Sequence, residues 1–238
     1  MFFGFWWDWT LLLVIPGLLF TLWAQYKVKS TYHKYSGVSA PWGMTGAAVA
    51  RRILDSNGLH DVPVEMVRGY LSDHYDPRSR VLRLSESVYH GNNVAALGVA
   101  SHEAGHALQH SRGYVPLRFR IAIVPLCSIG SNLAMPLFFI GLLMSGLSYI
   151  SEWLMLAGIL AFSLSVFFQL VTLPVEFNAS RRAMRCLAGS GTMSEEQLQG
   201  SRRVLTAAAM TYVAALAVGL LSLLRLVVIA MSRSSRRN

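Results

Sequence analysis

Apolar residues are concentrated in four long runs that alternate with more polar segments. The runs extend over about residues 9–25, 121–147, 153–173 and 204–231. A helix needs roughly 20 mostly apolar residues to cross the hydrocarbon core of a bilayer. The run lengths therefore predict four transmembrane helices. The link at 148–152 is short, which predicts that the second and third helices form a hairpin.

The first apolar run carries aromatic residues at both ends. Trp9 lies at its start, and Trp23 and Tyr26 lie at its end. Trp and Tyr are enriched at the two membrane–water interfaces, so these positions support a membrane crossing. A secretory signal peptide has a basic start and a small-x-small cleavage site, and this segment has neither. We therefore predict that residues 1–26 form an uncleaved transmembrane anchor.

The polar segment at 27–120 has the pattern of a soluble region with both helices and strands. Thr45 is a typical helix N-cap, and the residues after it predict a helix at 46–56. An Asn-Gly pair at 57–58 is expected to end this helix. A run of small apolar residues predicts a second, buried helix at 93–110.

Two short segments alternate between apolar and polar side chains, as the strands of a half-buried sheet do. They lie at 62–69 and 80–84, with turn residues at 76–79 between them. We predict that they form a small antiparallel sheet that precedes the helix at 93–110. An edge strand can hold an extended peptide backbone, and the segment at 81–84 is the candidate for that role.

The composition agrees with a membrane protein. Of the 238 residues, 53% are hydrophobic and 14% are charged, and the mean hydropathy is +0.42. Soluble domains have about 25% charged residues. The two cysteines, Cys127 and Cys186, indicate neither a disulfide framework nor a cysteine metal site.

The net charge of +9 does not indicate nucleic-acid binding, because no nucleic-acid motif is present and the basic residues flank the apolar runs. Such residues orient a membrane protein and contact the lipid bilayer. They are Lys27, Lys29, Lys34, Arg112, Arg118, Arg120, Arg181, Arg182, Arg185, Arg202 and Arg203. The positive-inside rule places them in the cytoplasm of a multi-pass cell-membrane protein. Four crossings would leave Arg233, Arg236 and Arg237 outside, which is the one conflict.

The predicted buried helix contains the motif His102-Glu103-Ala104-Gly105-His106. Residues four apart share one face of a helix, so both imidazoles can reach one metal ion. Zn²⁺ binds neutral imidazole and, in a catalytic site, keeps a position for water. Glu103 would lie beside that water as a general base. The pattern also occurs by chance, but two His and a Glu on a buried helix are costly unless paired or metal-bound, which favours a zinc site.

A catalytic zinc site needs a third protein ligand. His110 lies one turn beyond His106, but three ligands in line on one helix span about 12 Å and cannot all reach one ion. Glu176 is the better candidate, because Pro174 suits the first turn of a helix and a carboxylate from a second helix completes thermolysin-like sites. The alternative is that Glu176, as an anion, only stabilises that helix start.

Four segments resemble bacterial membrane-bound zinc metallopeptidases of the YugP type. They are WAQYKVKST (23–31), DHYDPR (73–78), HEAGH (102–106) and QLVTLPVEFNAS (169–180). That family is similar in outline to heat-shock membrane zinc proteases and the CAAX prenyl protease, which also place a membrane hairpin between H-E-x-x-H and a downstream E-x-x-x-D. The resemblance implies that His102, His106 and Glu176 bind zinc and that Glu103 is the general base. This chain has Ser180 where those relatives have the Asp that commonly braces a ligand His.

Two further polar residues are candidate contacts for the substrate or the transition state. His74, near the predicted turn, either donates a hydrogen bond to the reacting oxyanion or is a surface histidine beside turn residues. Asn178, two residues after Glu176, either contacts substrate or faces solvent. Both alternatives stay open for each residue.

The sequence predicts a mainly α-helical integral membrane protein with about four transmembrane helices and a zincin-like α+β catalytic part. The expected segments are an anchor at 1–26, a catalytic part at 27–120, a hairpin at 121–173, a helix with the third ligand at 174–203, and a transmembrane helix with a basic tail at 204–238.

Two functions from different classes fit this organisation. The first is a zinc-dependent endopeptidase that cleaves protein or peptide substrates at the cytoplasmic membrane face. The second is a non-proteolytic membrane scaffold whose zinc is structural. An intact Glu103 favours the first, because a structural site needs no general base. The substrate, a membrane partner and a homo-oligomeric state are left open.

Overall fold

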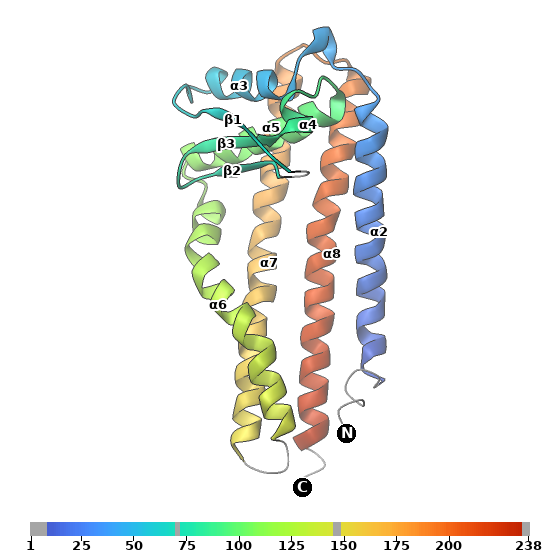
Figure 1. The fold of residues 1–238 in the computed structure, drawn as a ribbon, viewed down its shortest axis with the longest axis vertical. Coiled ribbons are helices and arrows are strands. Elements are labelled where there is room, and N and C mark those ends of the chain that lie inside the picture. Colours follow the sequence, from blue (N-terminus) through green and yellow to red (C-terminus); the bar gives the residue numbers. More distant parts are fainter. Residues whose placement is uncertain (1–8, 70–71, 145–148, 235–238) are drawn as a thin grey trace. The chain divides into compact units, whose positions relative to one another are not determined.

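The structure, a computed structural model, describes residues 9–69, 72–144 and 149–234. In chain order its elements are α2 (Leu11–Ser36), the 3₁₀ helix η1 (Pro41–Gly43), α3 (Gly46–Ser56), β1 (Val64–Val67), β2 (His74–Asp76), β3 (Val81–Ser85), α4 (Glu86–Tyr89), α5 (Val94–Ser111), α6 (Val115–Leu143), α7 (Ile150–Gly189) and α8 (Glu195–Ser234) (Figure 1). They belong to two compact units. We call Ala24–Arg118 with Pro174–Thr211 the sheet unit, and Met1–Trp23 with Phe119–Leu173 and Tyr212–Asn238 the apolar unit.

Four helices, α2, α6, α7 and α8, are long and apolar enough to cross a membrane. This confirms the predicted mainly α-helical membrane fold. The apolar runs are only parts of these helices, since α7 and α8 have 40 residues each. Residue 148 of the predicted hairpin link, and Arg236 and Arg237 of the predicted tail, lie outside the described residues.

The prediction that Pro174 begins a helix is wrong, because Pro174 lies inside α7. Proline removes one backbone donor, but long helices associated with membranes tolerate it where neighbouring groups satisfy the freed carbonyl. Glu176 is consequently far from the start of α7 at Ile150. The alternative in which Glu176 only stabilises a helix N-terminus is therefore excluded.

Close packing of small residues joins α6 and α7 in the apolar unit. A Cβ atom on Gly158 of α7 would lie 2.8 Å from the carbonyl oxygen of Ala134 in α6. Small residues allow such close helix contacts in membranes, where packing rather than apolar burial drives association. In α8, Arg225 donates a 3.1 Å hydrogen bond to Thr10, so the charge within the fourth apolar run has a polar partner.

The three-stranded sheet is mixed, so the prediction of an antiparallel sheet is corrected. The strand order is β1-β3-β2, with β1 parallel and β2 antiparallel to β3. The predicted turn joins β2 to β3, and the Asp76 carboxylate stabilises it by accepting hydrogen bonds from Arg78 N at 2.9 Å and Ser79 Oγ at 2.6 Å. The two strands β1 and β2 thus occupy opposite edges of β3.

The central position of β3 corrects a second expectation. The segment at 81–84 cannot hold a substrate by strand addition, because both edges of β3 already pair with other strands. Four of the five β3 residues are buried. The outer edge of β2, in contrast, has no strand partner among the described residues.

The buried helix α5 lies at the centre of the sheet unit. The Asn93 side chain caps its start by accepting a 2.9 Å hydrogen bond from Ala96 N. Twelve of its 18 residues are buried, most of them small or apolar. Helix α3, whose predicted bounds and Thr45 N-cap are confirmed, packs against it. This packing holds α5 in place, and α5 carries the H-E-x-x-H motif.

Candidate metal centre

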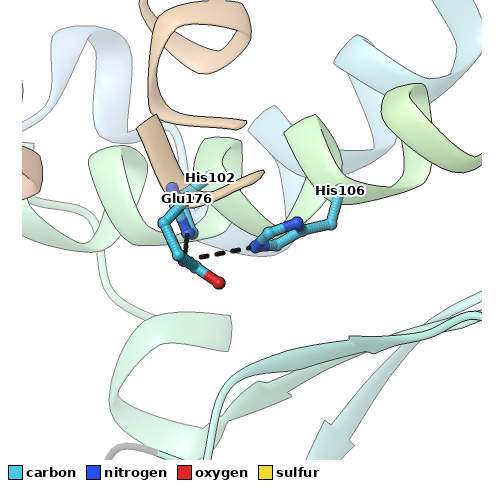
Figure 2. Close-up of side chains that lie close together, drawn as sticks. All are labelled: His102, His106 and Glu176. Atoms are coloured by element: carbon cyan, nitrogen blue, oxygen red, sulfur yellow. Dashed lines mark hydrogen bonds and ion pairs between the residues drawn. The ribbon is translucent and has the colours of Figure 1, made fainter. Parts of the chain in front are cut away.

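Two helical segments of the sheet unit supply the candidate metal ligands. His102 and His106 lie on one face of α5, and Glu176 lies in the part of α7 that follows Pro174. The structure brings one donor atom of each residue within 4.8 Å of the other two. Figure 2 shows the three side chains converging.

The spacing of the donor atoms fits a zinc ion. Oε2 of Glu176 lies 3.2 Å from Nε2 of His102 and 3.6 Å from Nε2 of His106. Ligands about 2.0–2.2 Å from a tetrahedral Zn²⁺ are roughly 3.3–3.6 Å apart. Two imidazole nitrogens and one carboxylate oxygen are also donors that zinc prefers. The three residues present therefore match zinc in both chemistry and geometry.

Gly105 allows α5 and α7 to approach each other at this point. A Cβ atom at Gly105 would lie 2.6 Å from the carbonyl oxygen of Ala179, which is too close for any real side chain. Gly105 lies between the two histidines in sequence, and Ala179 lies three residues after Glu176. The absence of a side chain at Gly105 thus permits the convergence of the three donors.

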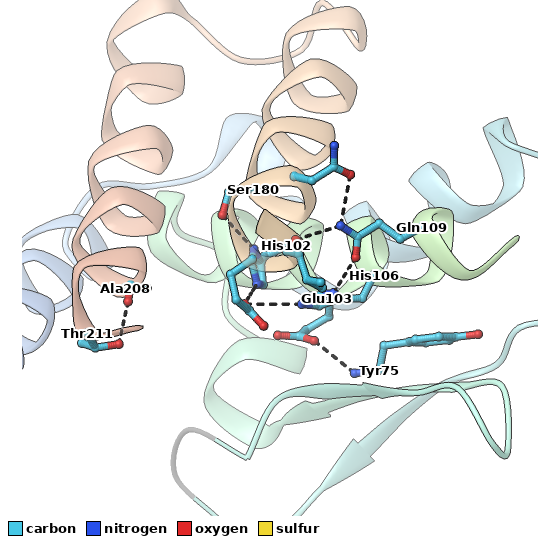
Figure 3. A network of polar contacts seen from close by, with 11 residues as sticks. Tyr75, His102, Glu103, His106, Gln109, Ser180, Ala208 and Thr211 are labelled. Carbon is cyan, nitrogen blue, oxygen red and sulfur yellow. Dashed lines mark hydrogen bonds and ion pairs between the residues drawn. The ribbon is translucent and has the colours of Figure 1, made fainter. Parts of the chain in front are cut away.

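Neutral side chains hold the far side of each imidazole ring. Ser180 Oγ lies 3.1 Å from Nδ1 of His102, and Gln109 Oε1 lies 3.0 Å from Nδ1 of His106. An amide oxygen only accepts, so the Nδ1 atom of His106 carries the proton and the Nε2 lone pair is directed toward Glu176. These contacts fix the orientation of both rings (Figure 3).

Gln109 belongs to a polar network that the sequence did not reveal. Its side chain is fully buried, and Nε2 donates to Val175 O at 2.8 Å and to Asn178 Oδ1 at 3.0 Å. The Val175 carbonyl can only accept, which fixes the orientation of the Gln109 amide. Asn178 also accepts a 2.7 Å bond from Arg182 Nε. Asn178 is therefore linked to His106 through Gln109. In the sequence, the feature that could have indicated a role for Gln109 is its place, one turn after a ligand in a buried helix.

Glu103 points toward the sheet rather than into the cluster of three donors. Its Oε2 atom accepts a 3.0 Å hydrogen bond from the backbone N–H of Tyr75 in β2 (Figure 3). The Tyr75 hydroxyl contacts Nδ1 of His110 at 2.9 Å, so His110 has a partner outside the cluster, as expected. His74 is exposed, and its Nδ1 atom lies 2.7 Å from Ser72 O.

Negative charge around His106 makes its ring more basic than usual. Burial lowers the pKa of His106, but the hydrogen bond that the protonated ring would donate to Glu176 and the charges of Glu103 and Glu176 outweigh burial and raise it above the ordinary value. The ring therefore lies in a field that attracts a positive charge, either a proton or a metal ion.

Comparisons with known proteins identify the family of the chain. Residues 10–231 match a family model described as "Putative neutral zinc metallopeptidase". A curated relative, "Putative membrane protease YugP" of Bacillus subtilis (strain 168), is 53% identical over 217 residues, which cover 91% of this chain and 94% of the relative. No solved structure matches. The resemblance noted in the sequence is confirmed at the level of the family.

Proposed function

Because the chain belongs to the neutral zinc metallopeptidase family, we propose that it is a membrane-embedded endopeptidase in which His102, His106 and Glu176 hold a catalytic zinc ion. The observation that carries this proposal is the convergence of these donors at 3.2 and 3.6 Å, with both Nδ1 atoms held from behind. Bound zinc would supply Lewis-acid activation of a water molecule.

Glu103 is the general base of the proposed reaction. Its carboxylate is adjacent in sequence to His102 but is not one of the three converging donors. In peptide hydrolysis, Glu103 accepts a proton from the attacking water and delivers it to the amine nitrogen as the peptide bond breaks. The Tyr75 N–H bond orients the carboxylate before substrate arrives.

The outer edge of β2 is the proposed support for the substrate backbone. Its Tyr75 amide lies at Glu103, and β2 has no second strand partner in the described part of the chain. An extended peptide added along this edge would run beside the general base. Asn178, through Gln109, acts as a positioning residue for His106. The oxyanion contact considered for His74 stays a prediction.

The basic residues that flank the apolar runs support a cytoplasmic location of the site. Arg112 and Arg118 precede the second run, and Arg181 and Arg182 follow the third. By the positive-inside rule these segments stay in the cytoplasm. Protein or peptide substrates would then reach the site from the cytoplasm or along the membrane surface.

The decisive experiment separates zinc binding from peptide cleavage. The full chain is purified in detergent, and its zinc content and its cleavage of an unstructured, fluorescence-quenched peptide library are measured. Glu103→Gln is expected to keep zinc and to lower cleavage by about 100- to 10,000-fold, because the amide cannot accept the proton. His106→Ala is expected to lose both zinc and cleavage.

A matched control is Glu86→Gln, which makes the same change at an exposed acid in α4 and is expected to leave both measurements unchanged. Zinc-loaded wild-type protein that cleaves no peptide would favour the scaffold with a structural zinc. Loss of zinc in Glu103→Gln would instead show that Glu103 is a ligand.

A further inference from the structure

A groove lies between α7 and α8, and, apart from Ser180, which contacts His102, its lining residues are not part of the proposed peptidase machinery. Phe177, Arg181 and Met184 line it from α7, and Arg202, Leu205 and Ala209 line it from α8. The groove has a volume of about 270 Å³, and all of these residues belong to the sheet unit. It is large enough to hold part of an organic ligand.

The groove combines an apolar lining with two uncommitted cations. Leu205 and Ala209 are buried beneath it, and Phe177 is 43% exposed. Arg181 and Arg202 are exposed, and neither forms an ion pair with any described residue. This combination suits a ligand that has an anionic end and an apolar end.

The arginines next to these two differ from them, because they already have partners. Arg182 donates to Asn178 at 2.7 Å and lies over the ring of Tyr114, and Arg203 donates to the Tyr35 hydroxyl at 3.0 Å. Among these four neighbouring arginines, the two that line the groove are therefore the ones without an ion pair or side-chain hydrogen bond to a described residue.

The positions of the two arginines in the sequence indicate where such a ligand comes from. Arg181 lies eight residues after the third apolar run ends at 173, and Arg202 lies two residues before the fourth begins at 204. Basic pockets next to membrane-spanning segments meet the headgroups of anionic lipids. The planar guanidinium group also forms paired hydrogen bonds with phosphate oxygens.

We propose that this groove binds one anionic phospholipid. The phosphate lies between Arg181 and Arg202, and the first part of an acyl chain lies over Phe177, Leu205 and Ala209. Free phosphate would leave the apolar lining unused, and a zwitterionic lipid would not match the two cations. This proposal does not depend on peptidase activity, because it concerns binding alone.

Native mass spectrometry of the full chain tests the proposal. The protein is released from mixed micelles that contain equal amounts of phosphatidylglycerol and phosphatidylcholine, and the retained lipid is counted. The wild type is expected to retain one phosphatidylglycerol in preference to phosphatidylcholine. The double variant Arg181→Gln/Arg202→Gln is expected to bind it roughly thirtyfold more weakly, from the contribution of each basic residue.

Two further variants make the result specific. Arg52→Gln/Arg68→Gln removes the same charge from exposed arginines that do not line the groove, and it is expected to retain the lipid like the wild type. Thr206→Trp keeps both arginines but fills the groove with an indole ring, and it is expected to lose the lipid. An unfolding temperature like that of the wild type confirms that each variant is folded.

Three results would overturn the proposal. The first is equal lipid retention by the wild type and Arg181→Gln/Arg202→Gln. The second is an equal loss of lipid in this variant and in the control double variant. The third is full lipid retention by Thr206→Trp. Displacement of the bound lipid by millimolar inorganic phosphate would show that the site recognises phosphate alone. Retention of the lipid against phosphate, with loss in Thr206→Trp, would support a lipid that uses both ends of the groove.

Discussion

Ser180 lies behind His102, and this residue determines how strongly the ring is held. Its hydroxyl lies 3.1 Å from Nδ1 of His102, so the ring has a hydrogen-bonding partner. A hydroxyl is a weaker acceptor than a carboxylate. The ring is therefore oriented, but it gains less electron density than it would from Asp.

We expect Ser180→Ala to weaken zinc binding by about tenfold or more, because partners of ligand histidines contribute roughly 10- to 100-fold in affinity. Ser180→Asp is expected to bind zinc at least as tightly as the wild type. Competition with a chelating dye measures all three affinities. Ser190→Ala is the control, since Ser190 bonds to a helix carbonyl far from the ligands. Equal affinity of wild type and Ser180→Ala would remove Ser180 from the site.

Zinc affinity should depend on pH through His106. A histidine must be neutral at the binding nitrogen, so a proton competes with the metal. Because the pKa of His106 is raised, this competition begins above the ordinary histidine value of about 6.5. The apparent affinity is expected to fall as the pH is lowered, and the fall should begin above that ordinary value. The same dye competition, repeated at a series of pH values above it, would show a flat profile if the raised pKa played no part.

At the scale of elements, the contact between α5 and α7 depends on one missing side chain. Gly105→Ala is expected to push the helices apart, because the added Cβ would lie 2.6 Å from Ala179 O. Glu176 would then move away from His102 and His106, and zinc content should fall in the purified protein.

Gly98→Ala is the matched control in the same helix. There an added Cβ would lie 3.4 Å from the nearest atom, the Cβ of Ser201, which is ordinary contact. Since Ala is about 1 kcal/mol better than Gly within a helix, this variant should keep zinc and lose no thermal stability. Similar zinc loss in both variants would point to a general effect on α5 rather than to the helix contact.

The elements that the sequence predicted well are those with strong local signals. The four apolar runs are long, and Thr45 and the Asn-Gly pair at 57–58 bound α3 as expected. The sheet was harder, because β2 has only three residues and shows no clear alternation. Parallel pairing of β1 with β3 depends on the path of the chain between them, which side-chain patterns do not record.

The candidate site shows the same division between local and distant information. The spacing of His102 and His106 is local, so the pair was evident from the sequence. Gln109 became important only because α7 brings Val175 and Asn178 to its amide. The prediction from Pro174 was wrong for a different reason. Proline favours the first turn of a helix, which is local information, but α7 continues through Pro174.

At the scale of the whole molecule, thiol labelling measures the orientation of the protein in the membrane. Cys127 and Cys186 are first replaced by Ser, and single thiols are then introduced at the exposed positions Arg78 and Glu196. The positive-inside rule predicts that a membrane-impermeant reagent labels neither thiol until the cells are opened.

The control thiol is placed at Tyr149, which is 71% exposed and directly precedes α7. Because one apolar run separates it from each of the flanking basic segments, it should be labelled in intact cells. Labelling of Arg78→Cys or Glu196→Cys in intact cells would reverse the orientation and place the site on the outer face.

The hydrogen bonds behind His102 and His106 have a practical consequence at the bench. Small zinc domains lose their fold when the metal is removed, because the ion is the main tie between their segments. Here Ser180, Gln109 and an extensive apolar core provide further contacts that hold the ligand-bearing helices. A preparation stripped of metal by a chelator should therefore stay folded in storage. It should then accept whichever divalent ion is supplied later. The metal found after purification consequently reflects how the protein was handled as well as what the cell provided.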